Sequence, residues 1–235
     1  MIGVVGSDTD AVTAALGAKG ATPRTGSPAH VLDGDPDAIV AVGRHAVTDL
    51  IADRPVPDVP ILALNAGEGF PKTGDAAAAV SELCSGRYAT LPHPVLGVAV
   101  EGSHVGNAAF DAMVVTSDPA RISEFRIVAG TELDAVRADG VVVATPAGSH
   151  GYARSAGGPR LRPGGGGAAV VPVAAFTMTP NRWVVGLDAP VEIRNERDVP
   201  LSLLVDDERR DLRPDRPVTV TAAGVIDLVV PDSAE

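Results

Sequence analysis

Short runs of consecutive apolar residues alternate with helix-like segments over the first 85 residues of the chain. Three such runs predict buried strands: Ile2–Val5, Ala38–Val42 and Ile61–Leu64. The segments that follow them predict three helices: Ser7 or Asp8 through Lys19, His45 to Ala52, and Gly74 to Ser85. Strands of four or five apolar residues that alternate with helices are typical of a parallel sheet with both faces covered.

Ligands of such sheets bind at the carboxyl ends of the strands. In this sequence those ends are Gly6–Asp8, Gly43–His45 and Asn65–Gly69. A ligand of the first part of the chain is therefore expected at one or more of these three segments.

The pattern changes after Tyr88, where short valine-rich runs recur with little helix between them. Ten runs predict strands: Val95–Val100, Ala112–Thr116, Ser123–Val128, Gly140–Ala144, Ala168–Val173, Trp183–Leu187, Val191–Arg194, Leu201–Val205, Val218–Ala222 and Ile226–Val230. One helix, from Ser149 to Ala156, is predicted among them. Regular short strands indicate an antiparallel sandwich or paired sheets. The predicted fold is thus an α/β domain with a parallel sheet over residues 1–90 and a β-rich, sandwich-like domain over 91–235. The last strand or strands, near 226–235, are candidates to return to the first domain.

Composition and charge restrict the possible partners. Hydrophobic residues make up 45% of the 235 residues, which is enough for a core. The formal net charge is −11, with 21 Asp and only two Lys. Such a surface repels nucleic acid and anionic membranes, because both require clustered cations. Many aspartates with almost no lysine indicate adaptation to concentrated salt, although compositional drift in a GC-rich genome gives the same bias.

Cysteine, histidine and hydropathy add four further expectations. Cys84 is the only cysteine, so no intrachain disulfide is possible, and it is expected in the core. None of the five histidines has the spacing of a zinc site, so no metal ligands are assigned. The N-terminus shows no charged segment of the kind that begins a signal peptide. The longest apolar run, Ala168–Phe176, is too short to cross a bilayer, and a cytoplasmic location is expected.

The segment Asp139–Pro159 carries the strongest indication of chemistry. It predicts a strand, a turn that contains Gly148, and a short helix that begins near Ser149. Amide N–H groups and the helix dipole at that start favour an anion. Gly148 allows close backbone approach, and the Thr145 and Ser149 hydroxyls add donors. A purely structural turn is the alternative that these residues alone leave open.

The same segment resembles the D-G-(V/I)-x-(V/I)-(S/A)-T-P-T-G-S-T-A-Y-x-x-S-A-G-G-P signature of the NAD kinase family. Twelve positions are identical: Asp139, Gly140, Thr145, Pro146, Gly148, Ser149, Tyr152, Ser155, Ala156, Gly157, Gly158 and Pro159. Further pieces resemble the family in order: Arg137, Pro172–Ala175 with Asn181-Arg182, and Val205-Asp206. The family also pairs an N-terminal α/β domain with a β-rich domain.

The resemblance implies an activity and a site. Family members phosphorylate the 2′-hydroxyl of NAD(H) with ATP or polyphosphate and Mg²⁺. They form dimers or tetramers in which one subunit completes a neighbour's dinucleotide pocket. Carried over by motif, His45 takes the catalytic position. The cofactor-binding positions are Gly43, Arg44, Asn65, Asp111, Ala112, Arg137, Asp139, Thr145, Gly148, Ser149, His150, Gly151, Tyr152 and Ser155.

The sequence departs from the family pattern where the family carries its catalytic aspartate. Gly43-Arg44-His45 stands in place of the first three residues of G-G-D-G-T. A carboxylate accepts protons and binds Mg²⁺ through oxygen, whereas neutral imidazole accepts protons but is a poor ligand for Mg²⁺. Glu68 is a second candidate for the base.

The family's Asn-Glu pair is replaced by Asp111-Ala112, and the Thr-Ala pair before Tyr152 is replaced by His150-Gly151. The features of a dinucleotide pocket are therefore better preserved than those of catalysis. Two functions stay open: an NAD kinase, or a catalytically impaired NAD(P)- or nucleotide-binding paralogue with a regulatory role. Lipid kinases resemble the same fold, but the acidic surface and the lack of a basic membrane face argue against one.

Overall fold

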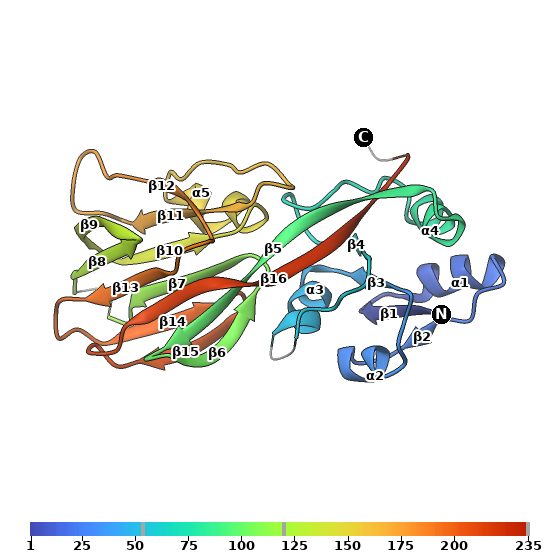
Figure 1. Ribbon diagram of the computed structural model, residues 1–235, viewed down its shortest axis with the longest axis horizontal. Coiled ribbons are helices and arrows are strands. Elements are labelled where there is room, and N and C mark those ends of the chain that lie inside the picture. The colour runs from blue at the N-terminus through green and yellow to red at the C-terminus, as the bar shows by residue number, and fades with distance from the viewer. Residues whose placement is uncertain (53–54, 119–120, 234–235) are drawn as a thin grey trace. The chain divides into compact units, whose positions relative to one another are not determined.

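The computed structural model describes residues 1–52, 55–118 and 121–233 (Figure 1). The chain divides into two compact units, Met1–His93 with Val225–Glu235, and Pro94–Gly224. Two long strands, β5 (Tyr88–Val100) and β16 (Val218–Pro231), contribute residues to both units. Among the described residues, no helix has both the length and the hydrophobicity that a bilayer crossing requires.

The first unit is an α/β layer structure. Its elements are β1 (Ile2–Gly6), α1 (Asp10–Ala18), β2 (Arg24–Thr25), α2 (Pro28–Leu32), β3 (Ala38–Val42), α3 (Arg44–Ile51), β4 (Ile61–Leu64) and α4 (Ala76–Ser85). Strands β2, β1, β3 and β4 pair in that order, all in parallel, and β4 also pairs in parallel with the end of β16. The parallel α/β arrangement that the apolar runs predicted is confirmed.

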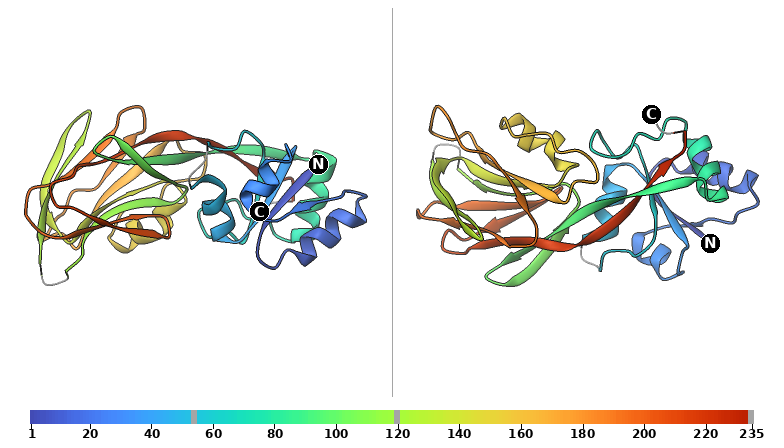
Figure 2. Two further views of the ribbon diagram at one scale, coloured as in Figure 1. Left: turned by 90° about the horizontal axis from the view of Figure 1, so that it is seen from below. Right: turned by 45° about the horizontal axis from the view of Figure 1, so that its top comes forward.

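Side chains that alternate along the strands of the first unit are buried on opposite faces of the sheet. Val4 and Val40 belong to one apolar cluster with residues of α1 and α4. Gly3 points to the other face, where a Cβ added to it would meet Val31 of α2. Helices therefore cover both faces, as the ribbons show (Figures 1 and 2), and this explains why the strands are apolar without interruption. The pattern missed β2 and α2, which have only two and five residues.

The second unit is an antiparallel sandwich with short helical turns. Its own elements are β6 (Ser103–Ala108), β7 (Asp111–Thr116), β8 (Ser123–Ala129), β9 (Thr131–Ala138), β10 (Gly140–Ala144), a 3₁₀ turn (Gly148–His150), α5 (Tyr152–Ser155), β11 (Gly167–Val173), β12 (Trp183–Gly186), β13 (Val191–Asn195), β14 (Leu201–Val205) and β15 (Glu208–Leu212). One layer has the order β12-β11-β10-β7-β14-β15, and β16, β13, β8 and β9 pair in the other layer with β5 and β6. The predicted sandwich is confirmed.

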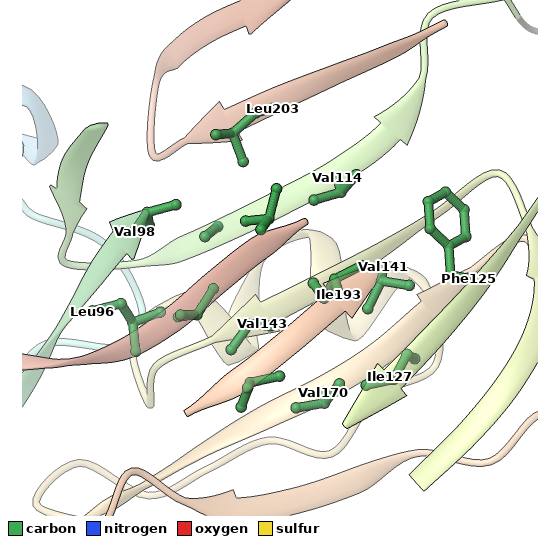
Figure 3. Close-up of a cluster of buried hydrophobic side chains, with 14 of the residues drawn as sticks. Leu96, Val98, Val114, Phe125, Ile127, Val141, Val143, Val170, Ile193 and Leu203 are labelled. Carbon is green, nitrogen blue, oxygen red and sulfur yellow. The ribbon is translucent and has the colours of Figure 1, made fainter. Parts of the chain in front are cut away.

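An apolar layer between the two sheets forms the core of the sandwich. Figure 3 shows side chains from both sheets in this layer, among them Val141 and Val143 of β10, Val170 of β11 and Ile193 of β13. Residues two apart in a strand point to the same face, so this set repeats with a period of two. Strands β6, β9 and β15 were not predicted because they carry many polar or charged residues.

The central strand β10 is buried on its second face as well. Val142 and Ala144 alternate with the core residues and belong to a second apolar cluster with Ala153 of α5, on the outer side of their sheet. The residues of β10 are therefore small or apolar at every position because both faces of the strand are buried. The packing of Ala153 against Val142 and Ala144 holds α5, and with it the segment after β10, against the sheet.

Two predictions about single elements are wrong. The helix expected from Ser149 to Ala156 is interrupted at Gly151, which has φ −96° and ψ −121° and separates the 3₁₀ turn from α5. Cys84 was expected in the core, but it is exposed on α4, because Ala79, Val80 and Leu83 form the buried face of that helix.

Candidate functional site

The first candidate site lies at the carboxyl ends of β1 and β3. A cavity of about 500 Å³ opens there and is lined by Val5, Gly6, Ser7, Gly26, Ser27, Pro28, Val42, Gly43, His45, Ala46 and Asp49. The chain moves from β1 outward to β2 and then returns to the other side of β1 to form β3. The strand order reverses at this point, and open parallel sheets bind ligands where that happens.

The connection between β3 and α3 at Gly43, here called the Gly43 loop, joins this cavity to the end of β4. Gly43 has φ +89°, a left-handed conformation that glycine adopts without strain, and an added Cβ would meet no atom within 4 Å. Its amide N–H donates to the Leu64 carbonyl oxygen at 2.8 Å. Asn65, the next residue after Leu64, is therefore held beside the loop, although it does not line the cavity.

The start of α3 presents His45 to the cavity. No side-chain hydrogen bond caps the start of this helix. His45 is exposed and lines the cavity, whereas Arg44 is half-buried and does not. Gly43 and His45 therefore share this space, and Arg44 does not.

The second candidate site lies on the outer side of the sheet that contains β10 and β11. A cavity of about 410 Å³ is lined by Tyr152, Ser155, Ala156, Pro172, Val173, Ala174, Ala175, Pro180 and Arg182. Two residues assigned from the sequence, Tyr152 and Ser155, thus share one space with Arg182. The combination of an aromatic ring, a hydroxyl and a guanidinium suits a nucleotide, since these groups can stack on a base and bind phosphate.

Arg182 is held in place by main-chain carbonyl groups. Its Nε and Nη2 atoms donate to the Ala156 carbonyl oxygen at 3.3 and 3.1 Å, and Nη1 donates to the Pro180 carbonyl oxygen at 3.3 Å. These bonds fix the side chain without neutralising its charge, because neither acceptor is a carboxylate. Three of the five N–H donors of the guanidinium are used, which leaves two for an anion in the cavity.

Asp139 and Gly148, both assigned from the sequence as cofactor-binding positions, do not lie together in one chain. Asp139 precedes the five-residue strand β10 and Thr145 follows it, so the two ends are about 20 Å apart. The Asp139 amide N–H donates to the carbonyl oxygen of Val173, a residue that lines the second cavity. Within one chain, Asp139 is therefore a neighbour of the Tyr152 cavity, and Gly148 lies at the far end of the strand.

The sequence suggested that Thr145 and Ser149 offer their hydroxyl groups to a ligand, but in the structure they do not. Both residues are fully buried. The Thr145 hydroxyl donates to the Ala109 carbonyl oxygen at 2.7 Å. The Ser149 hydroxyl donates to the Pro146 carbonyl oxygen at 2.7 Å and accepts from the Leu161 amide at 2.9 Å. These two hydroxyls stabilise the turn.

Gly148 is also structural. A Cβ at this position would lie 2.0 Å from the Phe110 carbonyl oxygen, so the close backbone approach is to Phe110 and not to a ligand. The helical turn that follows is too short to act as an anion site through its dipole, since α5 has four residues. The anion site predicted at Gly148 is therefore not supported.

Replacement of Gly148 by alanine is expected to destabilise the protein by about 1–3 kcal/mol, because the backbone must shift to accommodate a methyl group. Gly166→Ala is the matched control, since an added Cβ there meets no atom within 4 Å. Urea unfolding followed by circular dichroism measures both. Equal midpoints for the two variants would contradict the close approach at Phe110.

The carboxylate of Asp206 organises the segment before β7. The Asp206 carboxylate accepts from the amide N–H groups of Ala109, Phe110 and Asp111 at 2.8, 2.8 and 3.0 Å. The Asp206 amide N–H donates to the Asp111 carbonyl oxygen at 2.9 Å. From the other side, the amide N–H of Thr145 donates to the Phe110 carbonyl oxygen at 2.8 Å. Asp206 is therefore the centre of a backbone clamp on residues 109–111.

This clamp determines the positions of the Asp111-Ala112 pair. Asp111 is buried at the start of β7, and Ala112 belongs to the core between the two sheets. The Ala112 side chain therefore packs inside the sandwich and does not reach a ligand. His150 is half-buried and Gly151 is exposed, at the break between the 3₁₀ turn and α5. Arg137 is exposed at the end of β9 and pairs with Glu124 at 3.3 Å.

Comparison with known proteins gives the family. The profile of the ATP-NAD kinase C-terminal domain matches residues 88–225, which is more than half of the chain. The chain belongs to the NAD kinase family. The NAD kinase of Methanospirillum hungatei is 32% identical over 181 residues, which is 73% of this chain and 65% of the relative. The NAD kinase of Methanopyrus kandleri is 38% identical over 141 residues, 58% of this chain and 51% of the relative. The aligned part thus spans about half to two thirds of the length of these relatives.

Solved structures of NAD kinases share the fold. An NAD kinase from Archaeoglobus fulgidus in complex with ATP superposes with a TM-score of 0.75 over 98% of this chain and 93% of its own, at 21% identity. Yeast NADH kinase complexed with NADH gives a TM-score of 0.75 over 90% of this chain and 67% of its own, also at 21% identity. The two-part fold is therefore that of the NAD kinases. The family profile begins at residue 88, after the Gly43 loop.

Three residues that line or support the two candidate sites were not assigned to a site from the sequence: Asp49, Arg182 and Asp206. Asp206 and Arg182 were noted only as parts of the family resemblance, and their contacts come from distant segments. Asp49 gave one usable signal, because it follows His45 by four residues on a predicted helix and so shares its face. The described residues contain no group of three or more His, Cys, Asp or Glu side chains suited to a metal ion.

Proposed function

We propose that this NAD kinase family member binds NAD(H) and phosphorylates its 2′-hydroxyl with ATP or polyphosphate, in the presence of Mg²⁺, to give NADP(H). The supporting observation is the cavity that Tyr152, Ser155 and Arg182 share in the part of the chain matched by the family profile. The ring and the guanidinium bind the dinucleotide, and the Gly43 loop of the other unit binds the phosphoryl donor.

The chemistry assigned to the chain is mainly binding and proton transfer. In the transfer, a new bond forms between the 2′-oxygen and the terminal phosphorus, the bond from that phosphorus to the leaving phosphate oxygen breaks, and the 2′-hydroxyl loses its proton. His45 is the proposed acceptor of that proton, since imidazole acts as a general base near neutral pH. Bound Mg²⁺ supplies neutralisation of the phosphate charge.

We infer that the protein forms a homodimer or homotetramer in the cytoplasm and has no nucleic-acid or membrane partner. Asp139 and the Gly148 turn lie at opposite ends of β10, so one chain does not bring both to the same ligand. The acidic composition, with a net charge of −11, supports function in concentrated salt.

A second candidate function follows from the altered motif. Arg44 and His45 replace a glycine and an aspartate of the family pattern, and loss of a general base typically lowers the rate by roughly 10²–10⁴. With the Tyr152 cavity retained, the alternative is a catalytically impaired protein that binds NAD(P) or another nucleotide and acts as a regulator.

A single assay separates the two functions. The full-length protein in molar KCl is incubated with NAD, Mg²⁺ and either ATP or polyphosphate, and NADP is detected with an NADP-specific dehydrogenase. Formation of NADP in proportion to protein concentration is expected. No NADP, together with NAD binding by calorimetry, would favour the regulator, and failure to bind any adenine nucleotide would reject both functions.

A further inference from the structure

A carboxylate that no motif assigns lies in the cavity at the ends of β1 and β3. Asp49 lines this cavity together with His45, Gly43 and the hydroxyl-bearing residues Ser7 and Ser27. Asp49 follows His45 by four residues on α3, and side chains at that spacing lie on the same face of a helix, one turn apart. Asp49 is exposed and has no hydrogen bond or ion pair with any residue that the structure describes. Its oxygens are therefore available to a ligand.

The chemistry of the cavity defines that ligand. A cavity of about 500 Å³ is in the size range of small-molecule sites. Asp49 beside a polyphosphate would repel it, unless a cation lies between the two. Mg²⁺ is usually held in this way, by one or two carboxylates together with substrate phosphates and water. A cluster of three protein ligands is not needed for such a site.

His45 makes this arrangement necessary for the proposed reaction. It stands where the family pattern has an aspartate, and imidazole nitrogen is a poor ligand for Mg²⁺. The chain therefore lacks a carboxylate at the motif position and presents one a helical turn later, in the same cavity. We propose that Asp49 is the residue that binds the divalent cation of a cation–polyphosphate complex. This inference rests on the proposed function and names the metal ligand of the same site.

Asp49→Asn tests the assignment, because it keeps the size of the side chain and removes the charge. Asp10→Asn is the matched control, since it removes the same charge from α1 of the same unit, outside the cavity. Binding of Mn²⁺, a substitute for Mg²⁺, is titrated by electron paramagnetic resonance in the presence of tripolyphosphate, and binding of tripolyphosphate alone is measured by calorimetry without metal.

The two measurements are expected to change in opposite directions. Asp49→Asn should weaken Mn²⁺ binding by about tenfold or more, as expected when a metal site is disrupted. The same change should strengthen the binding of metal-free tripolyphosphate, because a negative charge is removed from its site. Asp10→Asn should change neither. Damage to the fold would weaken both, so the opposite signs identify a metal ligand.

Other results would overturn the inference. Unchanged Mn²⁺ affinity in Asp49→Asn would mean that Asp49 is only a solvated carboxylate. If the variant does not fold, the wild-type protein provides the test. Mn²⁺ added to its complex with tripolyphosphate should broaden the NMR signal of the His45 ring, which is assigned by comparison with His45→Gln. An unbroadened signal would refute the site. If the wild-type protein forms NADP and Asp49→Asn keeps its Mn²⁺ affinity, only the assignment of Asp49 as the metal ligand is rejected. Loss of Mn²⁺ affinity in a protein that makes no NADP would support the metal site and reject the kinase.

Discussion

Replacement of His45 by aspartate is expected to increase the rate of NADP formation by about 10²-fold, because it adds a metal ligand, and charge stabilisation by a bound metal ion is worth several kcal/mol. The variant places a carboxylate at the start of α3, on the edge of the cavity that Gly43 and Ser7 also line. A carboxylate there accepts the proton and also binds Mg²⁺, whereas imidazole performs only the first task. The initial rate with NAD, ATP and Mg²⁺ in molar KCl measures the effect.

His104→Asp is the control for this variant, because it adds the same charge at an exposed histidine of β6, in the other unit. Its rate should equal that of the wild type. Asp49 adds a second check, since Asp49→Asn should lower the rate much less in the His45→Asp background than in the wild type. Neighbouring groups that share one task are not additive. An unchanged rate in His45→Asp would contradict a catalytic role for a carboxylate at this position.

Replacement of Asp206 by asparagine is expected to lower the free energy of unfolding by about 3 kcal/mol. The charged carboxylate accepts three amide hydrogen bonds, and a bond to a charged group is worth about 1.5–3 kcal/mol. The total is reduced because Asp206 is half-buried and asparagine retains one acceptor oxygen. Asp206 has φ +50°, which asparagine tolerates as well as aspartate does, so backbone strain does not confuse the result. Urea unfolding measures the change.

The control is Asp211→Asn, at an exposed position on β15 of the same sheet. Substitutions of this kind usually change stability by less than about 0.5 kcal/mol. The Asp206 variant should also bind NAD more weakly, because the clamp joins the segment before Asp111 to Thr145, the first residue after β10. Equal unfolding midpoints for the two variants would contradict the role of Asp206.

The sequence by itself determined the two-part fold. Uninterrupted apolar runs separated by helices are typical of strands buried on both faces, and this identified β1, β3 and β4. The regular valine-rich runs identified most of the sandwich. Strands such as β9 and β15 were not predicted, because their exposed faces carry charged residues and no regular apolar pattern runs along them. The motif around Asp139–Pro159 likewise led to the family without any coordinates.

Only the tertiary structure decided what the residues of that motif do. Thr145, Gly148 and Ser149 match the family signature, yet their hydroxyls and close contacts are directed to the chain itself. Arg182 and Asp206 act on segments 26 and about 95 residues away along the chain. A sequence pattern records which residue types are present, but the partner of a buried polar group is set by how distant strands pack, and no local period carries that information.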